Sequence, residues 1–391
     1  LREAERGLPG NDPLFAWGFD PIYFGERRVT AADLDGVSAT RPVVVLHSNG
    51  HVMNVNTPVL ERSGLAAANI EGVIRDARGQ ATGELREMAA KYAVYRAIGN
   101  PQHGLMAGPG PLRRFAALAN RAGVTTATDL FTDLPDPVVA NYVETLRAPE
   151  VPLRLLPALN AQAQSAADGI AKIGRLRALN HDKLRFGLVK LMTDGSIQGL
   201  SGRLKWPGYM GGKPNGIWNI EPAALREILH AYHAAGLQCH IHTNGDEASE
   251  VAIDAIEAAL TRTPRPDHRH TLQHCQMADA AQFRRMKALG ICANLFANHI
   301  WYWGEQHAAM TMGPDKARRI DACATALREG VPLAMHSDAP VTPLAPLFTA
   351  WCAVNRLTPA GRVLGPEERI PVAAALRAIT LGAAYTLRLD G

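Results

Sequence analysis

Four times along the chain, a helical pattern runs into a glycine and continues directly as an apolar run rich in β-forming residues. The glycines are Gly123, Gly236, Gly290 and Gly330. A glycine in the left-handed conformation after a helix, followed by a short buried strand, is typical of the helix-to-strand turn in a parallel sheet. The repeated junction therefore predicts an α/β protein built on parallel strands.

Further apolar runs lie at 43–48, 151–159, 186–195 and 269–274, and the segments between the runs place apolar residues at helical spacing. This alternation favours a distorted (β/α)8 TIM barrel, which we expect to form a single domain over residues 1–391. A doubly wound open sheet is the alternative fold, but neither GxGxxG nor GxxxxGK(S/T) follows any predicted strand.

The composition excludes several classes of protein. With 47% apolar and 20% charged residues among 391, the chain is typical of a folded globular protein. It contains no apolar stretch long enough to span a membrane and no block of like charges, so we expect neither a membrane nor a nucleic acid as partner. The five cysteines form no CxxC pair, which favours a reducing, cytoplasmic location. Because the first residue is Leu1, we expect the native N-terminus to lie upstream.

Four polar residues stand at the ends of apolar runs: Lys190, His242, His274 and Asp338. Successive members are separated by 52, 32 and 64 residues. One strand and helix of a barrel take about 30–35 residues, which places the four on separate strands of the same rim. Two imidazoles and a carboxylate are ordinary zinc ligands, so the rim is a predicted metal site. An unmodified Lys190 does not suit it, because an ammonium group repels a cation and is costly to bury.

The chain resembles a known family in seven segments that follow one another in order. They are SNGHVMNVN, GVTTATDL, KLMTDGS, HIHTNGDEA, LQHCQ, SDAPVTPLAPL and ALRAITLGAAY. These segments are similar to the amidohydrolase superfamily, and most of all to amidohydrolase family 3, the branch that resembles N-substituted formamide deformylase. The similarity extends from about residue 15 to the end of the chain.

The resemblance implies a barrel that holds one or two divalent metal ions, usually zinc. In this branch the lysine of strand four carries a carbamate formed with CO2, which would make Lys190 an anionic bridging ligand. His242 and His274 match the metal-binding histidines, and Asp338 matches the aspartate that binds metal and moves the proton. A zinc-activated hydroxide would then hydrolyse the C–N bond of an amide or N-substituted formamide, which makes the expected partner a small molecule.

Two parts of the family pattern are missing from this sequence. The His-x-His motif of strand one is expected upstream of Leu1, and both halves of the family's β-sandwich are expected outside the chain. Residues 30–110 would then form an insertion before strand two. His240 and His242 have the same His-x-His spacing as the missing motif, but the following TNGD marks His242 as the ligand. His240 is either a further ligand or a hydrogen-bonded histidine one layer deeper in the barrel.

His51 and Asp194 are candidates with two interpretations each. His51 stands in a segment where Asn49 replaces the family's usual acid, and we expect it either to polarise the substrate carbonyl as a catalytic residue or to support a loop. Asp194 follows the predicted strand of Lys190 and is expected to form a turn, with a direct role in the site as the alternative.

Other candidates would contact the substrate. His299, Trp303 and His307 lie in the aromatic run 298–307 after strand seven, where they would line the substrate or anchor the loop. Arg203, together with Trp206 and Tyr209, would cover the site from the Pro- and Gly-rich loop 206–219 and its approach.

Other functions stay open at this point. A degenerate or truncated barrel could bind a small ligand without turning it over, and a related hydrolase could act on a lactone or another ester. A His-x-His motif upstream of Leu1 would favour the enzyme over the non-catalytic barrel. A homodimer is also left open, since nothing in the sequence decides the oligomeric state.

Overall fold

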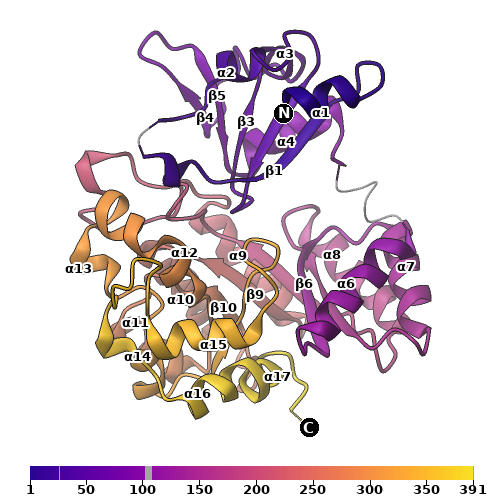
Figure 1. Ribbon diagram of the computed structural model, residues 1–391. Coiled ribbons are helices and arrows are strands. Elements are labelled where there is room, and N and C mark those ends of the chain that lie inside the picture. The colour runs from indigo at the N-terminus through magenta and orange to yellow at the C-terminus, as the bar shows by residue number, and fades with distance from the viewer. Residues whose placement is uncertain (26, 102–107, 391) are drawn as a thin grey trace.

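The computed structural model describes residues 1–25, 27–101 and 108–390, which form two β-sheets (Figure 1). The N-terminal sheet has the strand order β1-β2-β3-β5-β4, with β1 and β2 parallel and the other pairs antiparallel. Its strands are β1 (Leu14–Phe19), β2 (Val43–His47), β3 (Val52–Val55), β4 (Val73–Arg75) and β5 (Ala81–Arg86). Its helices are α1 (Arg2–Gly7), α2 (Ala31–Asp35), α3 (Thr57–Arg62) and α4 (Glu87–Ile98).

The second sheet contains seven parallel strands in sequence order, β6 to β12. They are β6 (Thr126–Thr132), β7 (Arg154–Asn160), β8 (Leu188–Met192), β9 (Gln238–Thr243), β10 (Thr271–His274), β11 (Cys292–Leu295) and β12 (Leu333–Met335). Each strand pairs with the next along the chain, as in a barrel, whereas a doubly wound sheet reverses its order. Within the described residues no ladder joins β12 to β6. An upstream first strand and a β-sandwich outside the chain stay predictions.

Helices precede and connect the parallel strands, and the junction glycines end four of them as predicted. Gly123, Gly236, Gly290 and Gly330 all have φ between 73° and 76°, the left-handed region that favours glycine. The helices are α6 (Pro109–Arg121), α7 (Asp136–Arg147), α8 (Ala166–Leu176), α9 (Pro222–Ala234), α10 (Asp246–Arg262), α11 (Ala280–Leu289), α12 (Asn298–Gln306), α13 (Pro314–Ala317), α14 (Cys323–Arg328), α15 (Pro346–Asn355), α16 (Val372–Arg377) and α17 (Ala383–Thr386).

The observed strands differ in extent from the apolar runs that predicted them. The run 186–195 forms a strand only over β8, and the run 269–274 only over β10. The run 43–48 becomes β2 of the N-terminal sheet, which lies within the range 30–110. That sheet begins earlier than the expected insertion 30–110, since β1 starts at Leu14, and its last helix ends at Ile98.

The N-terminal sheet contacts the loops that follow the parallel strands (Figure 1). The indole Nε1 of Trp303, on α12, donates to Asp20 Oδ2 at 2.7 Å. The amide Nδ2 of Asn219, before α9, donates to Glu87 Oε2 at 2.7 Å. These contacts bring the turn between β2 and β3, with His51, to the carboxyl ends of the parallel strands. Of the helices described, none is long and apolar enough to cross a bilayer.

Candidate metal and catalytic site

The structure brings the four predicted residues to the same edge of the parallel sheet. Lys190 lies in β8, His242 in β9 and His274 at the last position of β10, while Asp338 follows β12 by three residues. Lys190, His242 and His274 are buried, and Asp338 is partly exposed. Carboxyl ends of parallel strands meet at one edge, so side chains from distant parts of the sequence converge there.

Four imidazole rings form a continuous row across this edge. The ring centroids of His51 and His242 are 4.9 Å apart, those of His242 and His274 4.6 Å, and those of His274 and His336 4.8 Å. His336 was not predicted from the sequence, although it stands two residues before Asp338. Its position directly after a predicted strand and next to a predicted ligand was a usable signal for it.

Within the described residues, His274, His336 and Asp338 form a compact group of potential metal ligands. One donor atom from each lies within 4.8 Å of the others. His274 and Asp338 have φ of 71° and 50°, a left-handed conformation that costs a non-glycine residue about 1–3 kcal/mol. Such strain persists only where surrounding structure imposes it, and it often occurs at functional sites.

Burial sets the protonation of this group. It lowers the pKa of His242 and His274 well below the usual value and that of His336 to about 3, which leaves the rings neutral and able to act as metal ligands. Burial also lowers the pKa of Lys190 to about 8, and the nearby Asp338 carboxylate opposes this shift. An amine with a pKa near 8 is partly unprotonated at neutral pH, unlike an exposed lysine.

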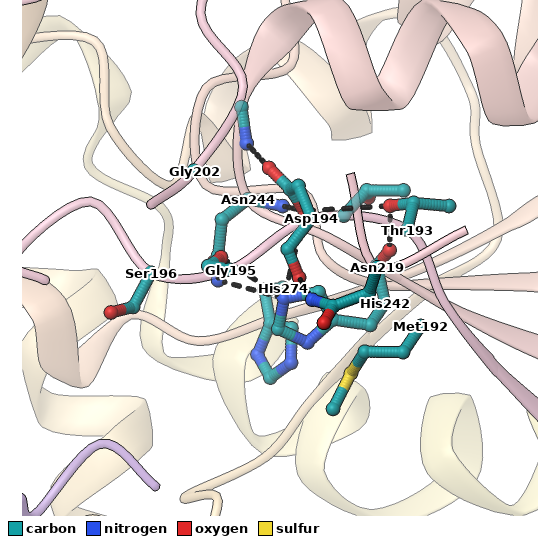
Figure 2. A network of polar contacts seen from close by, with 12 residues as sticks. Met192, Thr193, Asp194, Gly195, Ser196, Gly202, Asn219, His242, Asn244 and His274 are labelled. Atoms are coloured by element: carbon teal, nitrogen blue, oxygen red, sulfur yellow. Dashed lines mark hydrogen bonds and ion pairs between the residues drawn. The ribbon is translucent and has the colours of Figure 1, made fainter. Parts of the chain in front are cut away.

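Asp194 organises the loop behind His242 (Figure 2). Its carboxylate accepts hydrogen bonds from the backbone N–H groups of Gly245 at 2.8 Å, Arg203 at 2.9 Å and Asn244 at 3.0 Å. Despite these bonds, burial raises its pKa to about 7. Beyond the predicted turn, Asp194 therefore connects the loop after β8 to the start of α10. Asn244 Nδ2 in turn lies 3.2 Å from His242 Nε2.

His51 reaches the site with its ring held by a carboxylate. Its Nδ1 lies 3.0 Å from Glu87 Oε2, and Glu87 also accepts from Asn219. Glu87 is 1% exposed. If Nδ1–H donates to Glu87, the neutral ring presents the lone pair of Nε2. Glu87 was not predicted from the sequence, and no local pattern marks a partner 36 residues away.

His240 lies beside Lys190 in the strand register. Its Nδ1 contacts Gln273 Nε2 at 2.7 Å, and Asn294 Nδ2 donates to Gln273 Oε1 at 2.7 Å. These contacts place Nδ1 of His240 in an interior network, while its buried Nε2 has no hydrogen-bond partner within the described residues, so both interpretations given above stay predictions.

The predicted substrate contacts have hydrogen-bond partners within the protein. His299 Nδ1 lies 3.2 Å from Asp321 Oδ1, and His307 contacts Gln276 and Thr311 through its two ring nitrogens. Arg203 donates to both carboxylate oxygens of Glu247 and to the carbonyl of Gly216. Trp303 anchors Asp20, as described above. Roles of these four residues in substrate binding stay predictions.

Comparisons with known proteins agree with this architecture. A sequence model described as "Amidohydrolase family" matches residues 1–391. The putative amidohydrolase YtcJ of Bacillus subtilis is 25% identical over 395 residues, covering 98% of this chain and 72% of that protein. N-substituted formamide deformylase of Arthrobacter pascens is 32% identical over 152 residues, covering 38% of this chain and 28% of that protein. Among solved structures, an uncharacterised metal-dependent hydrolase from Pyrococcus horikoshii has the same fold, with a TM-score of 0.70, 20% identity, and coverage of 99% of this chain and 74% of that one.

Proposed function

The chain belongs to the amidohydrolase family, which makes it a hydrolase, and from this premise we propose that it uses a divalent metal ion to cleave an amide-type C–N bond. The observation that carries the proposal is the convergence of His274, His336 and Asp338, with Lys190 and His242 beside them, at the carboxyl edge of the sheet. N-substituted formamides are the preferred substrate class, because one relative at 32% identity bears that name.

The donor set fits a divalent cation. Neutral imidazoles and a carboxylate suit zinc, and the backbone strain at His274 and Asp338 is consistent with side chains held for a ligand. Lys190 fits in its carbamate form: the unprotonated amine adds CO2 and releases a proton, which replaces a potential cation with an anion. A bound metal ion would supply a Lewis acid that lowers the pKa of water and polarises a carbonyl.

Asp338 is the residue we assign to proton transfer. It stands beside Lys190 and His274 at the carboxyl edge of the parallel sheet. A carboxylate in this position can accept the proton of the attacking water and return it to the leaving nitrogen. His51 is a second proton acceptor in this scheme, because a neutral ring that donates Nδ1–H to Glu87 offers a lone pair on Nε2.

The proposal is tested by metal analysis and kinetics on the purified chain. We expect about one to two zinc ions per chain and hydrolysis of N-substituted formamides in preference to lactones. Lys190→Ala should lose metal and activity together. Asp338→Asn should lower kcat by about 100-fold or more, the usual contribution of a general acid–base group. Asp182→Asn is the control, since the Asp182 side chain is 96% exposed. A folded, metal-free protein whose hydrolysis zinc does not restore would refute the proposal.

A further inference from the structure

His299 is a second imidazole whose ring is held by a buried carboxylate, as the ring of His51 is. It is the second residue of α12, and its Nδ1 lies 3.2 Å from Oδ1 of Asp321. The side chains of His299 and Asp321 are 3% and 0% exposed. The other ring nitrogen of His299, Nε2, has no hydrogen-bond partner among the described residues. One polar atom of a firmly held ring is therefore available to a ligand.

Asp321 is itself fixed in place by its backbone. It has φ of 48°, a conformation that residues with a side chain seldom adopt outside functional or constrained sites. Its N–H donates to the carbonyl of Gln276 at 2.8 Å, and its carbonyl accepts from Nη1 of Arg356 at 3.1 Å. Burial raises the pKa of the Asp321 carboxyl, and the contact with His299 and the charge of Arg356 oppose this shift. A carboxylate that accepts the Nδ1–H of His299 selects the tautomer with a lone pair on Nε2.

The ring of Phe296 connects His299 to the candidate site. The centroid of the Phe296 ring lies 4.3 Å from that of His299 and 5.1 Å from that of His336. Asp338 lies within electrostatic range of both His299 and His51, which come from different sheets. A small molecule bound beside Asp338 would therefore have the Nε2 acceptor of His299 close to it.

We propose that His299 is a specificity-determining residue whose Nε2 accepts a hydrogen bond from the N–H group of a secondary amide, and that Asp321 is its positioning residue. The inference rests on the proposed function for the bond that is cleaved, and it adds which compounds that bond can belong to. An N-substituted formamide carries an N–H donor next to its carbonyl carbon, whereas an ester, a lactone or a tertiary amide has none. Each of these three would leave the Nε2 lone pair without a partner, which a buried site penalises.

Two other arrangements would give His299 a different role. In the first, the ring has the opposite tautomer, with its proton on Nε2, and only packs between Asp321 and Phe296. In the second, Nε2 binds the metal ion. The test must therefore determine the tautomer, the metal content and the dependence of the reaction on the substrate N–H separately.

Nitrogen-15 NMR of the metal-free full chain, labelled at histidine, reports the tautomer, because protonated and unprotonated ring nitrogens differ in chemical shift. His299→Phe assigns the signals and removes the acceptor, and His299→Gln keeps an acceptor as an amide oxygen. Kinetics of the zinc-loaded chain use three matched probes: N-ethylformamide, N-ethyl-N-methylformamide and ethyl formate. His47→Gln is the control, a buried histidine of the N-terminal sheet whose Nε2 lies 2.6 Å from Oδ1 of Asn54.

We expect His299 to carry its proton on Nδ1 in the parent, and Asp321→Asn to reduce the share of this tautomer. In His299→Phe, kcat/KM for N-ethylformamide should fall by about 10–100-fold, and that for the tertiary amide and the ester by less than about 3-fold. His299→Gln should recover part of the loss, and His47→Gln should leave all three values unchanged.

Three results would overturn the inference and leave the proposed function intact. They are a proton on Nε2 of His299, equal losses for all three probes in His299→Phe, and a loss of bound zinc in that variant. If the zinc-loaded parent hydrolyses neither formamide, the proposed function and this inference fail together.

Discussion

Glu87 connects the N-terminal sheet to the chemistry proposed for His51. It is 1% exposed and adopts φ of 64°, an uncommon conformation for a residue with a side chain. Burial opposes its charged form, but the contacts with His51, Ser201 and Asn219 hold its pKa below the usual value. An ionised carboxylate beside Nδ1 fixes both the orientation and the tautomer of the His51 ring. Glu87 is therefore a positioning residue for His51.

Replacing Glu87 by Gln tests this role with little change of shape. The variant removes the charge that selects the Nδ1–H tautomer, so we expect kcat/KM to fall about 10–100-fold, mostly through kcat, with an altered pH profile. Steady-state kinetics across pH measure the effect. Glu84→Gln is the control: Glu84 is equally buried, but its partners are Arg28 and Arg86, so that variant should lose thermal stability and keep kcat/KM. Equal losses of kcat/KM in both variants would contradict the positioning role.

At the residue scale, the sequence predicted the side chains that end apolar runs and missed those defined by long-range contacts. Lys190, His242 and His274 were found because a polar residue within or at the end of a buried strand is conspicuous. Glu87 and Asn219 meet across 132 positions, and neither stands at the end of a parallel strand. Such a long-range contact depends on tertiary packing, which a local sequence pattern does not predict.

At the element scale, the glycine junctions predicted the helix–strand units correctly, and strand ends were less predictable. The run 186–195 predicted a strand that leads into a turn at Asp194, and β8 occupies only Leu188–Met192 of it. Asp194 leaves the ladder because its carboxylate satisfies three backbone N–H groups of neighbouring loops. The strands β4 and β5 were not predicted, since β4 has only three residues and β5, with the sequence ATGELR, has no apolar run.

Arg356 holds the connections around β12 and gives a test at this scale. It is 0% exposed, and its guanidinium donates to the carbonyls of Leu364, Asp321, Ile320 and Arg318. Arg356→Met would leave the carbonyls of Leu364, Ile320 and Arg318 without the guanidinium donor, so we expect the free energy of unfolding to fall by about 3 kcal/mol or more. Urea denaturation measures the loss. The exposed Arg319→Met should change stability by less than about 0.5 kcal/mol, and a similarly small effect at Arg356 would contradict the argument.

At the scale of the whole molecule, two sheets far apart in the sequence build one site. The parallel sheet supplies the potential metal ligands, and the N-terminal sheet supplies His51 with Glu87. The sequence predicted the parallel sheet through its repeated junctions. It could not predict how the N-terminal sheet docks, because that depends on isolated contacts such as Trp303 with Asp20, which are 283 residues apart.

The interior of the whole molecule also contains many neutral histidines, which determines how its stability responds to acid. Burial lowers the pKa of His233, His268 and His270, three neighbouring rings near the starts of β9 and β10, and that of His307 to about 3. In the unfolded chain a histidine takes up its proton near pH 6.5. Between the folded and unfolded pKa values the unfolded chain therefore binds more protons, and stability falls as pH falls. Asp194 acts in the opposite direction, since its raised pKa lets the folded chain bind a proton first.

The contribution of His307 to the pH dependence of stability can be measured by itself. When a His307 variant is compared with the parent, the contributions of all the other titrating groups cancel. With a folded pKa of about 3 and an unfolded pKa of about 6.5, His307 should account for about 1.4 kcal/mol of the stability lost between about pH 7.5 and pH 5.5. His307→Gln is expected to be less stable at the higher pH, since the contacts with Gln276 and Thr311 change, but to lose about 1.4 kcal/mol less on acidification. Urea denaturation of metal-free protein at both pH values measures the difference, and parallel losses in parent and variant would show that His307 does not stay neutral in the fold.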